Sequence, residues 1–181
     1  MEFLENQFSD LERDKIFLMV LDPVTYSKTN LDLLKIFVSQ KRFSGLYLST
    51  NLPYETMIKM MMQNSIDATD IFFIDTTSNR CKSSKFYLCA SPTSLTEISI
   101  AISEALKELP RNKKFVVIDS ISSLLKHNSP DGVSKFIHFL AAKLKASNIV
   151  GIFFVVGQVL TDKPISKISH VADKIIVGGG K

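Results

Sequence analysis

Lys28 and Thr29 lie in the segment DPVTYSKTN (22–30), which follows the apolar run IFLMVL (16–21) and leads into LDLLKIFV. A strand, a turn and a helix in this order form the setting of a phosphate-binding loop. In such a loop the lysine contacts phosphate oxygens and the Ser or Thr after it holds Mg²⁺. Glycines let successive backbone N–H groups converge on the phosphates. Whether this segment can bind phosphate therefore depends on its glycine positions.

Asp22 and Ser27 occupy the positions where those glycines belong, and the chain has no glycine before Gly45. A non-glycine residue forced into the left-handed region costs about 1–2 kcal/mol, and Pro23 removes one N–H. An Asp22 carboxylate about 4 Å from a phosphate charge would add roughly 4 kcal/mol of repulsion at an effective dielectric near 20. Lys28 and the start of the following helix would still attract an anion. The favoured interpretation of Lys28 and Thr29, however, is that they are the N-cap and first-turn residues of an ordinary helix. Because about 1.4 kcal/mol is tenfold in affinity, we expect phosphate binding to be weakened by several decades.

Asp119 is the second residue that could serve nucleotide chemistry. It ends the apolar part of the run KKFVVIDSISSLL (113–125), and several apolar residues followed by Asp form the Walker B pattern. That carboxylate holds Mg²⁺ directly or through water. The pattern is weak alone, since any buried strand that ends in Asp matches it. The Lys28-Thr29 pair at the end of another expected strand strengthens it.

The elements that must position these residues alternate regularly along the chain. Short apolar runs, most of them continuous and rich in Val, Ile and Phe, occur at 16–21, 45–50, 71–75, 86–90, 115–119, 149–156 and 174–177. Continuous runs are typical of parallel strands covered on both faces. Segments with helical periodicity lie between them. The sequence therefore predicts an α/β fold with three αβα layers, a mainly parallel central sheet and right-handed crossovers.

Start signals mark several of the helices. Ser94 and Glu97 form a capping box before a helix that stops at Pro110. Ser129-Pro130-Asp131 reads as an N-cap, an N1 proline and a first-turn acid. Pro53 is expected to begin a helix with a methionine stripe, for which core packing is favoured over a binding face; the stripe comprises Met57, Met60 and Met61.

The whole chain, residues 1–181, is expected to form a single domain, because its length fits one core. Residues 1–14 contain an amphipathic N-terminal helix whose apolar stripe predicts docking on an apolar surface. The stripe is formed by Phe3, Leu4, Phe8 and Leu11. The net charge of +4 comes from scattered basic residues, so nucleic acid is not expected as a partner.

Two cysteines, Cys81 and Cys89, make neither a disulfide framework nor a zinc site. Cys89 lies in the apolar run FYLCA (86–90), where we expect a buried reduced thiol. No run reaches the roughly 18 residues that a membrane span requires. The expected location is therefore cytoplasmic, with no membrane partner.

Polar residues follow most of the expected strands. The exits are Asp22–Thr29, Ser49–Asn51, Asp75–Ser78, Asp119-Ser120 and Gly157-Gln158. Ligands of open parallel sheets bind outside the carboxyl ends of the strands, so these exits together predict a polar crevice. Each exit alone is equally well explained as a turn or a helix cap.

At this point the chain resembles the RecA superfamily, most closely its KaiC-like ATPases. The resemblance spans roughly residues 16 to 179 and is carried by FVVIDSISSLL, IVGIFFVVGQV, HVADKIIVGG, and GLYLST followed by LPYETM. It implies a residual nucleotide site in which Ser27 and Lys28 belong to the phosphate loop and Gln158 lies near a γ-phosphate-sensing strand end. It implies further that Thr29 and Asp119 would hold Mg²⁺, provided that a nucleotide binds.

The chain departs from that family after its second strand, where KaiC-like enzymes carry glutamates. One of them activates the attacking water, whereas this chain has Asn51 and Leu52 there. Neither side chain accepts a proton at neutral pH, so no general base is expected. Glu55 lies nearby, but one turn into an expected helix. No catalytic residue is predicted.

The leading hypothesis is a catalytically inactive RecA/KaiC-like domain, a pseudo-ATPase, with a regulatory or scaffolding role. It implies no cofactor, and a protein partner or a homo-oligomer. The alternative is a divergent NTP-binding protein or weak Mg-dependent ATPase that uses Lys28, Thr29 and Asp119. A different enzyme on this scaffold is disfavoured, because the chain lacks both Gly-x-Ser-x-Gly and Gly-x-Gly-x-x-Gly.

Overall fold

Seven parallel strands form one central sheet in the computed structural model, which describes residues 2–9, 11, 15–77, 87–110, 112–157 and 160–178. The strand order is β4-β3-β2-β5-β6-β1-β7, and every pair is parallel. The strands are β1 (Ile16–Leu21), β2 (Ser44–Ser49), β3 (Ile71–Asp75), β4 (Tyr87–Cys89), β5 (Lys114–Ile118), β6 (Val150–Val156) and β7 (Lys174–Gly178). The predicted α/β class and the continuous buried strands are confirmed.

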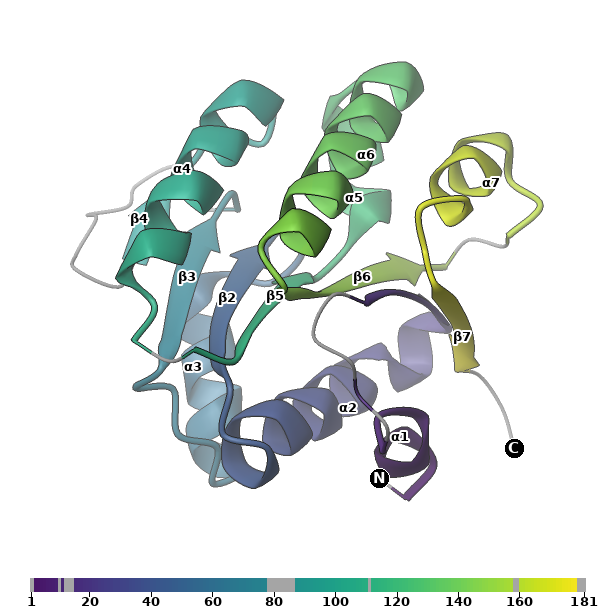
Figure 1. The fold of residues 1–181 in the computed structure, drawn as a ribbon. Coiled ribbons are helices and arrows are strands. Elements are labelled where there is room, and N and C mark those ends of the chain that lie inside the picture. Colours follow the sequence, from purple (N-terminus) through teal and green to yellow (C-terminus); the bar gives the residue numbers. More distant parts are fainter. Residues whose placement is uncertain are drawn as a thin grey trace.

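Helices cover both faces of this sheet (Figure 1). One face carries α1 (Glu2–Gln7), α2 (Pro23–Leu34) with its π-helical continuation η1 (Lys35–Gln40), and α3 (Tyr54–Gln63). The other carries α4 (Leu95–Glu108), α5 (Ile121–His127), α6 (Pro130–Ala146) and α7 (Lys163–Ser169). Two hydrophobic clusters, one on each face, form the core between these layers. The arrangement is the predicted three-layer sandwich.

The helix start signals at Ser94 and Ser129 are confirmed. The Ser94 hydroxyl accepts a hydrogen bond from the Glu97 N–H at 3.2 Å, and the Ser129 hydroxyl accepts one from the Gly132 N–H at 3.2 Å. In α3, Met57 and Met61 are fully buried. These two methionines therefore pack in the core, as expected.

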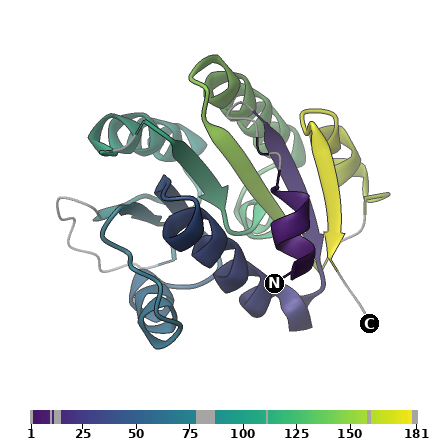
Figure 2. The same ribbon diagram turned by 60° about the horizontal axis from the view of Figure 1, so that its bottom comes forward.

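The N-terminal segment is only partly as predicted. Helix α1 spans Glu2–Gln7, and Leu4 and Phe8 are buried. The Phe8 ring packs edge-on against Phe17 and Phe37, with centroids 4.9 and 5.2 Å apart. This contact holds the segment against the sheet beside β1 (Figure 2). Phe3, however, is 54% exposed, because it lies on the outer side of α1, so its assignment to the docking stripe is wrong.

Close packing of two strands depends on Gly45 in β2. Gly45 is paired with Phe115 of β5, and the Phe115 ring lies over the glycine. A Cβ added at Gly45 would lie only 2.3 Å from the ring atom Cζ of Phe115. A side chain at this position would therefore push the ring out of the core.

Cys89 differs from the expectation. It is half-buried and disulfide-bonded, so the prediction of a buried reduced thiol is wrong. Cys89 lies on β4, the edge strand, where a side chain is less enclosed than in the centre of the sheet. Cys81, the other cysteine of the chain, lies outside the described residues. Stable disulfides are commonest outside a reducing cytosol, and the cytoplasmic location stays a prediction.

Within the described ranges, no helix combines the length and the apolar character that crossing a bilayer requires.

Candidate functional site

The connection between β1 and α2 is a single residue, Asp22, because the helix begins at Pro23. Asp22 is the N-cap, and its carboxylate accepts a hydrogen bond from the Val24 N–H at 2.8 Å. The N–H groups of Thr25 and Tyr26 donate to the Asp22 carbonyl at 3.1 and 3.0 Å. Pro23 has no N–H. Every backbone donor of the first helical turn is therefore absent or already used.

The predicted turn over residues 22–30 is consequently wrong, since most of that segment is helix. Ser27, Lys28 and Thr29 lie in the second turn of α2, where Lys28 is exposed and the other two are half-buried. The Asp22-Pro23 pair is the reason. An N-cap acceptor followed by an N1 proline starts a helix at once.

The buried side of α2 carries Tyr26 and Asn30, which are 3% and 1% exposed. The Asn30 amide donates hydrogen bonds to the hydroxyl groups of Tyr26, at 3.4 Å, and Tyr47. The Tyr47 hydroxyl in turn donates to Asp119 Oδ2 at 3.4 Å. Helix α2 thus approaches the predicted Walker B acid through tyrosine hydroxyls, and burial beside Asp119 raises the pKa of both tyrosines.

Asp119 follows β5 and has no exposed surface. Its Oδ1 accepts hydrogen bonds from the Thr50 N–H at 3.0 Å and the Thr50 hydroxyl at 2.7 Å. Its Oδ2 accepts from the Asn51 N–H at 3.4 Å, in addition to Tyr47. Burial raises the pKa of Asp119 to about 6, although the hydrogen bonds from Thr50 and Asn51 oppose the rise. Asp119 therefore fixes the chain where it leaves β2.

Asp75, at the end of β3, has the same structural role. It is fully buried and accepts hydrogen bonds from the N–H and the hydroxyl of Thr77, at 2.6 and 2.8 Å. It also accepts from the Tyr54 N–H at 3.0 Å and the Tyr87 hydroxyl at 3.3 Å. The carboxylates of Asp75 and Asp119 thus accept hydrogen bonds from other groups of the protein.

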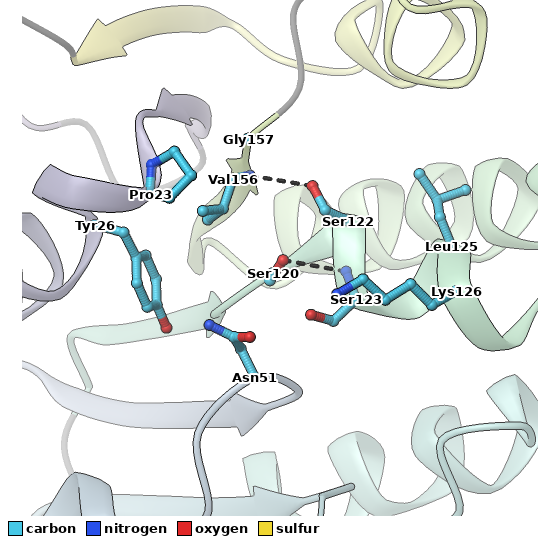
Figure 3. Close-up of a pocket in the computed structure, with 10 residues that line it drawn as sticks. All are labelled: Pro23, Tyr26, Asn51, Ser120, Ser122, Ser123, Leu125, Lys126, Val156 and Gly157. Atoms are coloured by element: carbon cyan, nitrogen blue, oxygen red, sulfur yellow. Dashed lines mark hydrogen bonds between the residues drawn. The ribbon is translucent and has the colours of Figure 1, made fainter.

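A cavity of about 540 Å³ opens above these acids, at the carboxyl ends of the strands (Figure 3). Its lining comes from α2, from the exits of β2, β5 and β6, and from α5: Pro23, Tyr26, Asn51, Ser120, Ser122, Ser123, Leu125, Lys126, Val156 and Gly157. Figure 3 shows the Tyr26 hydroxyl and the Asn51 side-chain amide next to each other in this lining. Gly157 has φ of +70° and lies against Pro23, a backbone conformation that favours glycine.

A second cavity, of about 280 Å³, continues along the same edge of the sheet. It is lined by Thr50, Asn51, Thr76, Thr77, Pro92, Ser123, Leu124 and His127. Asn51 and Ser123 line both cavities. The polar crevice expected from the strand exits is therefore present, with Asn51, Ser120, Thr76 and Gly157 gathered in it.

The residues of the predicted residual nucleotide site do not gather in these cavities. Lys28 and Thr29 are not among the residues that line either cavity, and Asp119 lies buried beneath them. Gln158 and Ser78 lie outside the described residues. Sequence reasoning missed Ser122, Ser123, Lys126 and His127, which lie on α5 beyond the expected strand exit. Tyr26 falls within the expected exit Asp22–Thr29 but is not singled out there as a site residue. The helical period of α2, which places Pro23, Tyr26 and Asn30 on one side, is the signal for it.

A P-loop nucleotide with Mg²⁺ does not fit these residues as they are arranged. Asp22 places its own carboxylate on the helix start where phosphate would lie, and the helix donors are taken. Both oxygens of Asp119 accept protein hydrogen bonds. Across the described part of the chain, no group of three or more His, Cys, Asp or Glu residues could hold a metal ion.

A family profile described as a family of unknown function, DUF7504, matches residues 66–177. The chain belongs to this family. The matched region runs from the segment before β3 to β7 and includes Asp75, Asp119 and the whole of α5. The buried acids at the ends of β3 and β5 therefore lie within the DUF7504 region, whereas Asp22 and α2 precede it. No curated protein matches the sequence.

Two solved structures from Pyrococcus horikoshii resemble this DUF7504 chain. The KaiC-like protein PH0186 from strain OT3 has a TM-score of 0.67 at 14% identity, over 91% of this chain and 70% of that one. The uncharacterized protein PH0321, solved in complex with an unknown peptide, has a TM-score of 0.72 at 12% identity. That match covers 100% of this chain and 84% of the other. Both support a KaiC/RecA-like fold.

Proposed function

We propose that this chain is a catalytically inactive RecA/KaiC-like domain that acts through protein interaction, in a regulatory or scaffolding role. The observation that carries the proposal is the one-residue connection between β1 and α2. A phosphate cradle needs several free backbone N–H groups that converge on one point. Here the corresponding groups belong to a capped helix turn.

The surroundings of Asp119 and Asn51 support the same proposal. A metal-bound carboxylate needs oxygen lone pairs directed at the ion or its waters. Asp119 directs its oxygens at Thr50, Asn51 and Tyr47. Asn51 occupies the position where the resemblance to KaiC-like enzymes implies a glutamate, and an amide is no general base. Binding and hydrolysis of a nucleotide are both disfavoured.

The partner that we propose is a peptide segment of another protein. The structure of PH0321, which shares this fold, was solved with an unknown peptide. The polar cavities at the carboxyl edge of the present chain offer hydroxyl and amide groups of the kind that bind peptide backbone. These two observations support the choice of a peptide.

Nucleotide binding is tested first by thermal unfolding of the full chain with and without millimolar ATP and Mg²⁺, beside a phosphate-release assay. We expect an unchanged melting temperature and no release above background. A ligand at about 100 times its Kd would instead stabilise the fold by about 2.7 kcal/mol, which thermal unfolding detects easily.

Lys28→Ala and Asp119→Ala give this test its specificity. Lys28 is exposed, so its replacement leaves the fold intact. Magnesium-dependent turnover that Lys28→Ala abolishes would refute the proposal. So would a thermal shift that Asp119→Ala removes. Either result would establish the divergent NTP-binding protein or weak ATPase in its place.

A further inference from the structure

The two cavities at the carboxyl edge adjoin each other through shared lining residues, and together we call them the trench. Pro23 and Gly157 lie at one end, beside β1 and β6, and Thr76 and Thr77 lie at the other, after β3. Asn51 and Ser123, which line both cavities, join the two parts. The trench therefore crosses the ends of β1, β6, β5, β2 and β3, which are consecutive in the sheet.

The middle of the trench lies at a topological switch point. The chain leaves β2 toward α3, which packs in the cluster on one face, and leaves β5 toward α5, which packs in the cluster on the other. β2 and β5 are neighbours in the sheet, so the two connections diverge and leave a crevice between them. Crevices of this kind are where open α/β sheets bind ligands.

The trench has the length of a short extended peptide. Five neighbouring strands spaced at about 4.8 Å span about 19 Å, the length of about six extended residues at about 3.3 Å each. The lining is rich in hydroxyl groups and includes the Asn51 amide. Such groups donate and accept hydrogen bonds, and each peptide unit carries one donor and one acceptor.

The charge of the trench selects the kind of peptide. Among the described residues that line it there is no carboxylate, because Asp75 and Asp119 lie buried beneath it, bound to protein donors. Lys126 lines the larger cavity and His127 the smaller one, and both are exposed. An acidic group placed beside α5 meets the positive charge of Lys126, and no carboxylate among the described lining residues lies beside it.

We propose that the trench binds an extended peptide segment of a partner protein, with an acidic side chain placed beside Lys126. This inference rests on the proposed function and names the site through which it works. Single-stranded nucleic acid is the poorer fit, because binding it needs a basic groove with stacking aromatics. The described lining of the trench offers only Lys126, His127 and one tyrosine, Tyr26.

The test begins with a phage library of random heptapeptides, panned on the folded full chain. Synthetic copies of the enriched peptides are then titrated by fluorescence polarisation. We expect acidic residues to be over-represented among the enriched sequences. Failure to enrich any peptide overturns the proposal.

Asn51→Trp fills the junction of the two cavities, and its backbone contact with Asp119 is kept because only the side chain changes. We expect it to weaken peptide binding about tenfold or more, which corresponds to about 1.4 kcal/mol. Lys126→Glu should weaken the acidic peptides and leave amide-substituted copies unaffected. Since Lys126 is exposed, that variant remains decisive even if the tryptophan variant does not fold.

Lys59→Glu is the matched control, because Lys59 is an exposed lysine on α3 away from the trench. It should leave the affinity unchanged. A second comparison uses Val177→Asp on β7, the edge strand, where Val177 is 63% exposed. Peptides that lose binding to Val177→Asp but keep binding to Asn51→Trp would overturn the trench proposal and leave the proposed function standing. Magnesium-dependent ATP turnover would instead defeat the proposed function itself.

Discussion

At the scale of single residues, Asp22 decides what the start of α2 can bind. Its carboxylate accepts from Val24, and its carbonyl accepts from Thr25 and Tyr26. A free helix start is an anion site because its N–H groups lack partners. At α2 one side chain and one carbonyl supply those partners from within the chain.

Asp22→Ala should lower the free energy of unfolding by about 1 kcal/mol, because it removes the N-cap acceptor. Urea denaturation followed by circular dichroism measures the difference. Asp22→Ser is the control, since its hydroxyl keeps an acceptor at the cap and should retain most of the stability. Equal losses in the two variants would contradict the capping role.

Prediction from sequence failed at this residue for an identifiable reason. Ser129-Pro130 was interpreted correctly as an N-cap and an N1 proline, and Asp22-Pro23 has the same form. The Lys28-Thr29 pair matches only two residues of the phosphate-loop motif, yet it favours a loop over a helix in this segment. The local signal of an N-cap followed by an N1 proline predicts the structure correctly.

At the scale of elements, the strands could be predicted well because parallel strands buried on both faces appear as continuous apolar runs. The expected run 16–21 coincides with β1, and 71–75 coincides with β3. The hydrogen bonds that Asp75 and Asp119 accept from Tyr54 and Thr50 could not be predicted. These partners lie far away in sequence, and only the strand order brings them together.

Gly45→Ala tests how tightly β2 and β5 pack. The added Cβ would overlap the Phe115 ring, so we expect a loss of about 1–3 kcal/mol from overpacking. Phe115→Leu in the same chain makes room for the methyl group. The double variant should therefore lose less stability than the sum of the two single variants, as measured by a double-mutant cycle. Additive losses would show that the ring is not the obstacle.

At the scale of the whole molecule, the fold buries the Asp119 carboxylate, and keeping that group ionised in the core lowers the free energy of unfolding. Burial raises the pKa of Asp119 from 3.8 to about 6, so ionisation is harder in the folded than in the unfolded chain. Below about pH 4 the group is protonated in both states and contributes nothing. Above about pH 6 it is ionised in both, and the folded state bears the full penalty.

Wild type should therefore lose stability relative to Asp119→Asn as the pH rises from about 4 to about 6, by an amount on the order of 3 kcal/mol. Urea denaturation of both proteins across this range gives the difference. Comparing the two cancels the titration of groups that they share. If the stability of wild type relative to Asp119→Asn stays constant or rises with pH, the ionised form of Asp119 is not disfavoured by folding.

The trench is likewise a property of the whole molecule. The strand exits could be expected at one edge of the sheet, because all parallel strands end there. Tyr26 and Lys126 could not be assigned to it, since their places depend on where α2 begins and how α5 turns away from β5. Neither amino-acid composition nor hydrophobic periodicity determines the direction in which these helices leave the sheet.

The early start of α2 also limits what could be engineered at this end of the sheet. Tyr26 is 3% exposed and packs edge-on against Phe154, with centroids 6.1 Å apart. Building a phosphate loop here would require unwinding the turns that hold this ring and moving the ring out of the core. Glycines introduced at 22 and 27 would leave the ring in place, so these two substitutions alone would cost stability without creating a phosphate site.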